Sequence, residues 1–427
     1  MKLIRFLEKQ YLGISVSGIN GIKIRLILIL SDSFRYFRIL ILSPFLVVIR
    51  VISPFVVIRI GPLVSSRIGH FAGNIELYLI EKEVGINVPD KYHIDLFFVE
   101  KKVCNTFLYN KWKQKLIILP SVFLSPIYKL NSYVSGGSIH QINFPSGDRD
   151  IHNLLDKSIS SSISFTAEEL KFGEARLKDL GVTKNSSIVC LIVRDCAYLN
   201  SISNKENNQH NYRDGNVKNY LLMAEELTKK GYVVIRMGAI VKDIFESKNP
   251  MIIDYASSGK RSDFMDIYLG SRCEFCVSTS TGWDSVPFHL FRKPCLFVTV
   301  PLGIFFTFTK QTLNITKFHY SHDLGRYLTL EEIGEYSLHL SMGSNLFRGH
   351  KIELIEPSPI DIWEAVEEMI EISKKSFNYT TQEQNQQKQF WNFYSRVMGD
   401  DLLRLHGELK SRIGKKFLQR NAHWLLK

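Results

Sequence analysis

Two charged residues, Arg194 and Asp195, follow directly after a compact apolar run at residues 188–193. The run is short and rich in β-branched residues, which is typical of a buried strand. The planar guanidinium of an arginine fits a phosphate or diphosphate group through parallel N–H donors. In an open parallel sheet, ligands bind outside the carboxyl ends of the strands. The position therefore predicts a site for an anionic ligand; an ion pair between Arg194 and Asp195 that caps the strand is the alternative interpretation.

A loop rich in hydroxyl groups follows another predicted strand, at residues 273–277, and precedes a predicted helix at residues 286–291. Such a loop offers hydroxyl donors, free backbone N–H groups and the positive end of a helix dipole, all of which suit an anion. An ordinary helix cap within a serine-rich loop is the alternative. The loop residues that we expect to bind substrate are Ser278, Thr279, Ser280, Thr281 and Gly282.

A third loop lies between a predicted strand at residues 55–60 and a predicted helix at residues 71–82. Its small residues would let a ligand approach the backbone and the start of the helix. We expect Arg67 and Gly69 to contact substrate there, and His70 follows them directly.

The polar loop at residues 200–215 and the strand predicted at residues 232–238 lie next to the Arg194 position in the chain. Together with the strand before Arg194 they form one strand–loop–helix–strand unit. The remaining candidates for substrate binding are Tyr212, Arg213, Arg236 and Gly238.

The elements that would hold these loops alternate between strands and helices, which predicts an α/β fold. Apolar runs indicate strands at residues 55–60, 94–99, 116–119, 188–193, 232–238, 252–255, 273–277 and 295–300. Helical patterns are found at residues 71–82, 168–180, 217–230, 262–269, 286–291 and 361–374, and Thr166-Ala-Glu-Glu is a capping box before one of them. The polar cluster of His319, His322, Asp323 and Arg326 indicates a surface loop.

The chain has 427 residues and a net charge of +12. That length favours two domains, and the charge favours partners that carry phosphate or an anionic membrane surface. The predicted parts are a membrane-associating segment (1–53), an N-terminal domain with a polar linker at residues 132–164 (54–165), a second domain (166–375) and a basic helical tail (376–427). Six irregularly spaced cysteines do not indicate a disulfide framework, so a reducing compartment is expected.

The first 53 residues combine apolar segments with basic residues. Before Glu76 the only acidic residues are Glu8 and Asp32, against ten Lys or Arg. The apolar segments are interrupted by Arg38 and Arg50, so none reaches the roughly 20 residues that a membrane span needs. This composition predicts helices that lie in the membrane interface, where basic side chains reach anionic headgroups. A helical pair packed on the protein's own core is the alternative.

Several short segments resemble a bacterial glycosyltransferase family found with surface-polysaccharide genes. They are Arg67-Ile-Gly-His70, Val193-Arg-Asp195, His210-Asn-Tyr-Arg213, residues 232–238, and residues 278–282 with Lys293-Pro294 after them. An arginine after a strand with an acidic neighbour also resembles the HxRxxD signature of fucosyltransferases that have two Rossmann-like domains. This chain has Ile192 in place of the histidine, and its Asp195 follows Arg194 directly.

The resemblance implies a GT-B-like fold with two Rossmann-like domains. In such enzymes the C-terminal domain holds a nucleotide-sugar and the N-terminal domain holds the acceptor. The expected activity is transfer of a hexose or deoxyhexose to a lipid-linked or surface-polysaccharide acceptor, such as LPS O-antigen or capsule. It would take place at the cytoplasmic face of the inner membrane, on a peripheral protein.

The chemistry of this transfer needs charge stabilisation for the leaving diphosphate and a base for the acceptor hydroxyl. His70, His210 and Asp195 are the candidate bases, with Asp214 as another; either histidine could instead be structural. No paired acidic residues are placed as a metal site, so we expect a metal-independent reaction without a cofactor. No nucleic-acid partner is expected, because the basic residues concentrate in the apolar N-terminal segment and not in a polar patch with interleaved aromatic residues. A sugar-nucleotide epimerase of similar fold and a non-catalytic membrane scaffold remain alternatives.

Overall fold

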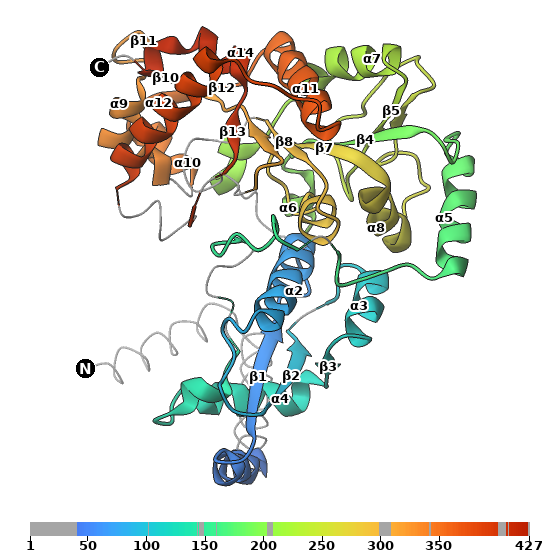
Figure 1. The fold of residues 1–427 in the computed structure, drawn as a ribbon, viewed down its shortest axis with the longest axis vertical. Coiled ribbons are helices and arrows are strands. Elements are labelled where there is room, and N and C mark those ends of the chain that lie inside the picture. The colour runs from blue at the N-terminus through green and yellow to red at the C-terminus, as the bar shows by residue number, and fades with distance from the viewer. Residues whose placement is uncertain are drawn as a thin grey trace, which may run out of the picture. The chain divides into compact units, whose positions relative to one another are not determined.

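The computed structural model describes residues 41–100, 102–142, 144, 149–158, 160–202, 208–298, 309–340, 343–399, 407–408 and 410–425 (Figure 1). Contacts divide the chain into two compact units. The first unit comprises Met1–Leu63, Pro89–Glu100 and Leu116–Asn143, and the second comprises Val64–Val88, Lys101–Lys115 and Phe144–Lys427. Both units contain parallel strands, as expected for an α/β protein. The domain boundaries predicted at residues 53, 165 and 375 stay predictions.

The first unit contains a parallel sheet in the order β1-β2-β3. Its elements are β1 (Val57–Leu63), β2 (His93–Val99), β3 (Ile117–Ile118), α4 (Ser121–Asn131) and η1 (Gly137–His140). Inside this unit Arg59 and Asp95 form a buried ion pair at 2.6 Å between Nε and Oδ1, which joins the two longest strands. The predicted strands at residues 55–60 and 94–99 are thus confirmed, although β1 begins two residues later.

A helix over residues 41–52 precedes β1. Its side chains Leu42, Leu46 and Ile49 are buried in a cluster that includes Ile60, Phe98, Leu124 and Ile127. One side of this helix therefore packs on the protein's own core, as the alternative interpretation proposed. The remainder of the predicted membrane segment, residues 1–40, lies outside the described residues. Among the helices that are described, none has the length and hydropathy required to cross a membrane.

In the described residues the second unit contains a seven-stranded sheet in the order β13-β9-β8-β7-β4-β5-β6. Each neighbouring pair is parallel. The strands are β4 (Ser187–Ile192), β5 (Tyr232–Arg236), β6 (Ile252–Asp254), β7 (Cys273–Ser278), β8 (Cys295–Phe297), β9 (Thr312–Asn314) and β13 (Arg412–Ile413). From β4 the chain runs through β5 to β6 on one side and through β7 to β9 on the other. This is the doubly wound strand order of nucleotide-binding folds.

The helices of the second unit include those that connect and cover these strands (Figure 1). They also include two helices, at residues 68–83 and 106–113, that follow β1 and β2 in the chain. The described helices of this unit are α2 (Ile68–Glu83), α3 (Thr106–Lys113), α5 (Ala167–Asp179), α6 (Ala197–Ile202), η2 (Asn208–Arg213), η3 (Val217–Tyr220), α7 (Leu221–Lys229), α8 (Asp263–Arg272), η4 (Val286–Leu290), α9 (Leu330–Glu335), η5 (Leu338–Leu340), α10 (Ser344–Gly349), α11 (Pro359–Ser373), α12 (Thr381–Met398), α14 (Lys415–Arg420) and η6 (Ala422–Leu425). The capping box before α5 is confirmed, because Thr166 Oγ1 accepts from Glu169 N and Glu169 accepts from Thr166 N. The reciprocal bonds satisfy two N–H groups that a helix start leaves free.

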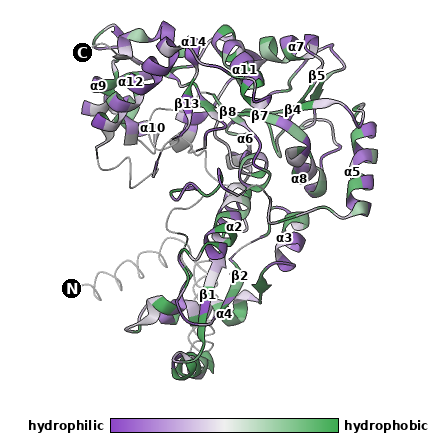
Figure 2. Cartoon of the chain, in the orientation of Figure 1, coloured by the Kyte–Doolittle hydropathy of each residue, from purple (hydrophilic) through white to green (hydrophobic). Residues whose placement is uncertain are grey.

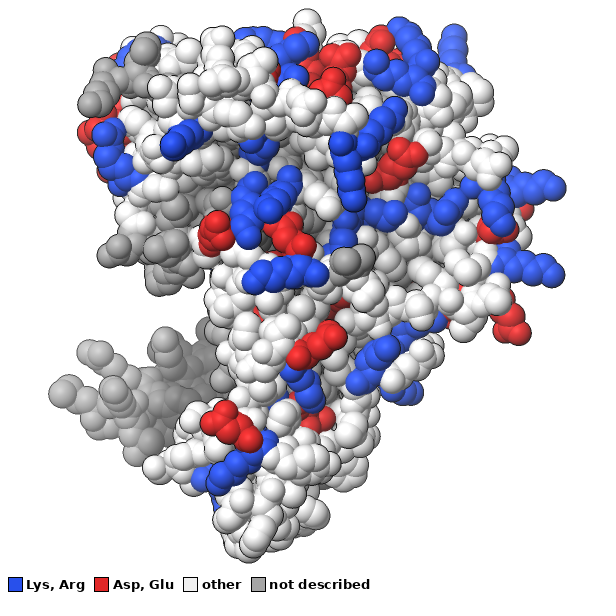
Figure 3. Space-filling model, viewed as in Figure 1, with Lys and Arg blue, Asp and Glu red and all other residues white. Residues whose placement is uncertain are grey.

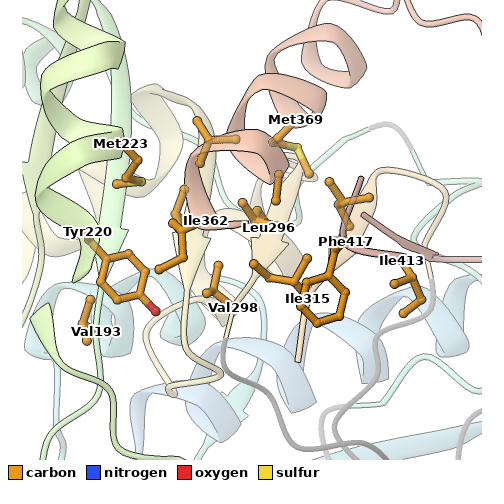
Figure 4. Packing of buried hydrophobic residues seen from close by; sticks show 14 of the residues in the cluster. Val193, Tyr220, Met223, Leu296, Val298, Ile315, Ile362, Met369, Ile413 and Phe417 are labelled. Carbon is orange, nitrogen blue, oxygen red and sulfur yellow. The ribbon is translucent and has the colours of Figure 1, made fainter. Parts of the chain in front are cut away.

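One apolar core lies between the sheet and the helices α7 and α11 (Figure 4). Tyr220 and Met223 reach it from the α7 side, Ile362 and Met369 from α11, and Leu296 from the sheet. All five side chains are completely buried. The helical spacing of the apolar residues in α7 and α11 thus corresponds to the faces that cover the sheet.

Two predictions for the C-terminal third hold only in part. The side chains of His322, Asp323 and Arg326 are exposed, as a surface loop predicts. His319 does not lie in a surface loop: it is 1% exposed in β10 (Phe318–Ser321), which pairs with β11 (Arg326–Tyr327) and β12 (Ile352–Ile355) in an antiparallel sheet. The tail is not only helical, since β13 pairs with β9 and forms one edge of the large sheet. In both cases a strand of two to four residues is too short to show a periodic pattern.

The predicted linker at residues 132–164 is more structured than its polar composition indicates. Within the first unit, Ile142 N donates to Ile60 O at 2.9 Å, which extends the edge of β1. In the second unit, Leu154 and Leu155 are buried, and Asp150 accepts from both of their N–H groups at 2.8 Å. Packing of a few apolar side chains overrides the local preference for a loop.

Glu368 of α11 is expected to make the stability of the second unit depend on pH. Its carboxyl accepts from Tyr379 Oη and Lys415 N, both at 2.7 Å, and burial raises its pKa from the ordinary 4.5 to about 7. Between these values the folded chain retains a proton that the unfolded chain has lost, so stability falls as pH rises from about 4.5 to about 7. Glu368→Gln should therefore show a smaller decrease in melting temperature across that window than the unmodified chain. Glu371→Gln, at an exposed position of the same helix, is the control and should keep the original slope; an unchanged slope in Glu368→Gln would contradict the prediction.

Candidate functional site

The second unit has one place where the strand order reverses, between β4 and β7, which lie side by side in Figure 1. The connections from these strands leave in opposite directions, and in open parallel sheets ligands bind at such a point, outside the carboxyl ends of the strands. Arg194 follows β4, and residues 279–282 follow β7. The two loops singled out from the sequence therefore meet at the position where ligands bind in sheets of this kind.

Residues 278–282, which begin at the last residue of β7, are called the hydroxyl loop. The backbone of Arg194 is fixed to this loop, because Arg194 N donates to Thr279 Oγ1 at 2.7 Å. Its side chain is 14% exposed, and Nε lies 3.1 Å from Asp214 Oδ1. The proposed ion pair between Arg194 and Asp195 is therefore wrong; the partner is Asp214. Burial raises the pKa of the Asp214 carboxyl, while Arg194 and then Lys317 act in the opposite direction. The guanidinium remains partly accessible for a ligand.

Asp195 makes different contacts. Its Oδ1 accepts from Ala197 N at 2.9 Å, and its Oδ2 accepts from Lys242 N at 2.8 Å. Arg236 Nη2 is 4.0 Å from the same Oδ2. Each carboxylate oxygen thus already binds the backbone, so Asp195 stabilises the start of α6 and the loop after β5.

The hydroxyl loop is organised by Ser278. Its Oγ donates to Asp284 Oδ2 at 2.6 Å and accepts from Ser280 N at 3.1 Å. Ser280 has a φ of 60°, in the left-handed region that non-glycine residues rarely adopt. Backbone strain of this kind is found preferentially at functional sites, where the surrounding bonds maintain it. Here the Ser278–Asp284 bond and a bond from Arg213 Nη2 to Ser280 O hold the turn.

Two further polar groups lie at this edge of the sheet. Thr281 Oγ1 is buried and has no hydrogen-bond partner in the described part of the chain, so it can donate to a ligand. Lys317, which follows β9, is 4% exposed and donates from Nζ to Asp214 O at 2.6 Å. Burial lowers the pKa of Lys317, and Glu356 and Asp214 oppose that shift. Sequence reasoning missed Lys317; its place just after the apolar residues Leu313 and Ile315 was the available signal.

The start of α2 lies against the hydroxyl loop within the same unit. A Cβ built on Gly69 would be 2.9 Å from Gly282 Cα, closer than a real contact allows. The glycines are needed here because the two backbones approach each other, a reason that the sequence did not reveal. Arg67 is the N-cap of α2 but makes no side-chain cap bond. His70 is half-buried, with Nδ1 3.4 Å from Asn74 Oδ1.

The other predicted site residues either make contacts away from Arg194 and the hydroxyl loop or have side chains outside the described residues. Arg236 is 1% exposed and donates to Asp243 O at 2.8 Å, so its charge is used inside the unit. A Cβ on Gly238 would be 2.6 Å from Val241 Cγ1, which makes that glycine a packing requirement. The Tyr212 ring packs 5.7 Å from that of Phe347 in the core. The side chain of His210 is outside the described residues.

The second unit also buries histidine and cysteine side chains. Burial lowers the pKa of His319 to about 3, so the ring is neutral at physiological pH. Cys273 and Cys276 lie in β7 and are completely buried, and burial holds the Cys276 pKa well above its ordinary value. In the part of the chain that is described, no group of three His, Cys, Asp or Glu residues is placed to hold a metal ion.

Comparison with known proteins gives likenesses at low scores only. No family model and no curated protein sequence matches the chain. Escherichia coli ADP-heptose LPS heptosyltransferase II matches at 11% identity, over 60% of this chain and 90% of its own, with a TM-score of 0.37. A family 9 glycosyltransferase from Veillonella parvula matches at 11% identity, over 60% of this chain and 85% of its own, with a TM-score of 0.38. An E. coli heptosyltransferase with ADP-2-deoxy-2-fluoro heptose matches at 8% identity, over 60% of this chain and 93% of its own, with a TM-score of 0.29.

Proposed function

We propose that the chain is a glycosyltransferase that transfers a sugar from a nucleotide-sugar donor to a glycan acceptor. One observation carries the proposal: Arg194 and the hydroxyl loop of residues 278–282 meet at the switch point of a doubly wound sheet. That position suits a nucleotide diphosphate. The resemblance of these same segments to a surface-polysaccharide glycosyltransferase family supports the reaction type.

The proposed site would act mainly by electrostatic stabilisation. When the glycosidic bond to the donor breaks, negative charge develops on the leaving diphosphate. Arg194 would bind this charge through its guanidinium, and Thr281 would donate its unpaired hydroxyl. Lys317, which follows β9 and donates to Asp214 O, would add positive potential in its protonated form. Donors that are already fixed in place cost no reorganisation during the reaction, which makes this kind of stabilisation effective.

His70 is the base that we propose for the acceptor hydroxyl. It is half-buried in the first turn of α2 and follows Gly69, whose backbone approaches Gly282 of the hydroxyl loop. Asp195 is less suitable because both of its oxygens accept bonds from the backbone, and Asp214 is paired with Arg194. His210 remains a second candidate by residue type.

The acceptor that we propose is a lipid-linked or surface-polysaccharide glycan, such as LPS O-antigen or capsule. The transferred sugar is proposed to be a hexose or deoxyhexose, because that is what the family resemblance implies. Such an acceptor would be reached from the membrane surface. A peripheral location at the cytoplasmic face of the inner membrane therefore belongs to the same proposal.

Binding of nucleotides tests the proposal directly. The purified full chain should be titrated with UDP, GDP, ADP and CDP, with the melting temperature as the readout, because a ligand that binds only the folded state raises it. The nucleotide that binds then identifies which sugar donors to try with an acceptor. Release of an altered donor sugar without an acceptor would instead indicate an epimerase. If no nucleotide shifts the melting temperature, the proposed donor site is wrong.

Transfer is expected to be independent of a divalent metal. Arg194, Lys317 and the hydroxyl of Thr281 would stabilise the leaving diphosphate, as a metal ion does in other transferases. Once a donor and an acceptor are identified, initial rates should be measured with and without EDTA, and we expect equal rates. Complete loss of activity on chelation, restored by magnesium or manganese, would contradict the expectation.

A further inference from the structure

The helix of residues 41–52 is apolar on two sides. One side packs on the core through Leu42, Leu46 and Ile49. The exposed apolar residues on the rest of the helix and just after it are Ile41, Phe45, Val47, Val48, Val51 and Phe55, at 53–81% exposure. Figure 2 colours this segment predominantly green, as hydrophobic. A helix that serves only the fold of its own unit would carry polar residues on the outer side.

A second exposed apolar group belongs to the same unit. It lies along β3, α4 and the turn that follows, and its members are Ile117, Leu119, Val122, Phe123, Tyr133, Val134 and Ile139. Two contacts of Arg50 connect it to the helix: Nη1 donates to Ser135 O at 2.9 Å, and Nη2 donates to Asn131 Oδ1 at 3.2 Å. The end of the helix is therefore tied to the turn that carries Tyr133 and Val134. We call these two exposed groups together the apolar surface.

The chain segments that carry this apolar surface contain no acidic residue. Residues 41–63 and 116–142 include Arg50, Arg59 and Lys129 but neither Asp nor Glu. Arg59 is neutralised inside the unit by Asp95, whereas Lys129 is exposed. In Figure 3 the atoms where Figure 1 draws the helix of residues 41–52 are mainly white. Large exposed apolar patches mark binding surfaces, and the sign of the charge around them indicates the partner.

We propose that this apolar surface docks on an anionic lipid bilayer, with Phe45, Val51 and Phe123 in the interfacial region. Aromatic and aliphatic side chains with basic neighbours are the composition of interfacial membrane helices. A second copy of the chain fits less well. A two-fold interface would bring the same surface against itself, and the basic residues would face each other without an acidic partner from these segments. The inference concerns only this unit and holds whether or not the chain transfers a sugar.

The proposal extends the membrane expectation beyond the first 53 residues. Phe123 and Tyr133 lie far along the chain from that segment, and folding brings them to the same unit. Membrane binding should therefore depend on positions in two separate parts of the sequence. A substitution in either part should weaken binding, and an effect confined to one of the two parts would not be expected.

Co-sedimentation of the purified full chain with lipid vesicles tests the proposal. Vesicles of phosphatidylcholine alone should be compared with vesicles that also contain phosphatidylglycerol. We expect Val51→Asp and Phe123→Asp each to weaken binding by at least about tenfold, because each would place a charge where an apolar side chain inserts. Lys129→Glu should weaken binding at least about fivefold, and only to the vesicles with phosphatidylglycerol.

Matched controls are available in the second unit. Ile244 and Ile360 are 59% and 58% exposed, comparable with the positions that the proposal uses. Ile244→Asp and Ile360→Asp should bind vesicles as the unmodified chain does. The melting temperature of each variant shows that it is folded, and exposed substitutions usually change stability little.

Three outcomes would overturn the proposal. In the first, Val51→Asp and Phe123→Asp bind vesicles normally. In the second, size-exclusion chromatography shows a dimer that these variants convert to a monomer while vesicle binding is unchanged, so a second copy covers the surface. In the third, the variants lower the melting temperature and leave vesicle binding intact, as expected if another part of the chain covers these residues. Loss of vesicle binding in a folded monomeric variant supports the bilayer as partner.

Discussion

Arg194→Lys is expected to lower donor affinity, or kcat/KM once a reaction is established, by at least about tenfold. Lysine keeps the charge but loses the planar pair of donors that binds two phosphate oxygens at once. A hydrogen bond to a charged group contributes about 1.5–3 kcal/mol, and about 1.4 kcal/mol is tenfold in affinity. The affinity for the nucleotide diphosphate and the melting temperature should be measured on the same purified variant. The melting temperature should change little.

Arg348→Lys is the matched control, since within the described residues this exposed arginine donates to Asn345 Oδ1 alone, in its own helix. The variant Asp214→Asn separates the two roles that Arg194 could have, which are binding of the donor diphosphate and pairing with Asp214. If Arg194 serves only to hold Asp214, then Arg194→Ala and Asp214→Asn should lower the melting temperature alike while nucleotide affinity stays unchanged. Unchanged nucleotide affinity in a folded Arg194→Ala protein would show that the proposed donor site is wrong.

Arg292→Met should destabilise the second unit by about 3–5 kcal/mol, the usual cost of removing one partner from a buried ion pair. Arg292 Nη2 lies 2.7 Å from Glu76 Oε1, and the Glu76 side chain is completely buried. Burial raises the pKa of Glu76, and Arg292 opposes that shift. This pair joins α2, which carries His70, to the chain just after η4. Urea denaturation of the unmodified chain and of the Arg292→Met variant gives the difference in their free energies of unfolding.

Two comparisons make this result specific. Arg176→Met removes an exposed ion pair with Asp179 and should cost at most about 1 kcal/mol. The double variant Arg292→Met with Glu76→Gln should regain part of the loss, because it no longer buries an unpaired charge. A loss below about 1 kcal/mol in Arg292→Met would contradict the role of the pair.

Local patterns predicted most of the elements. The apolar run before Arg194 became β4, and the capping box at Thr166 begins α5 as expected. The predicted helix at residues 217–230 is a short turn, η3, followed by α7. These signals work because a strand, a helix and a cap each depend on residues only a few positions apart. Because local patterns cover only nearby residues, they did not predict the burial of His319, which comes from distant neighbours.

The amino-acid sequence alone showed which strands are followed by residues that can bind an anion: Arg194 after one strand and the hydroxyl loop after another. Only the tertiary structure decided that these ends are adjacent, that Asp214 and not Asp195 pairs with Arg194, and that Lys317 joins them. It also decided that the tail adds β13 to the sheet. The physical reason is that backbone hydrogen bonds between parallel strands are the same for any pair of strands. Strand order is therefore set by packing among residues that are far apart in the chain, which no local pattern records.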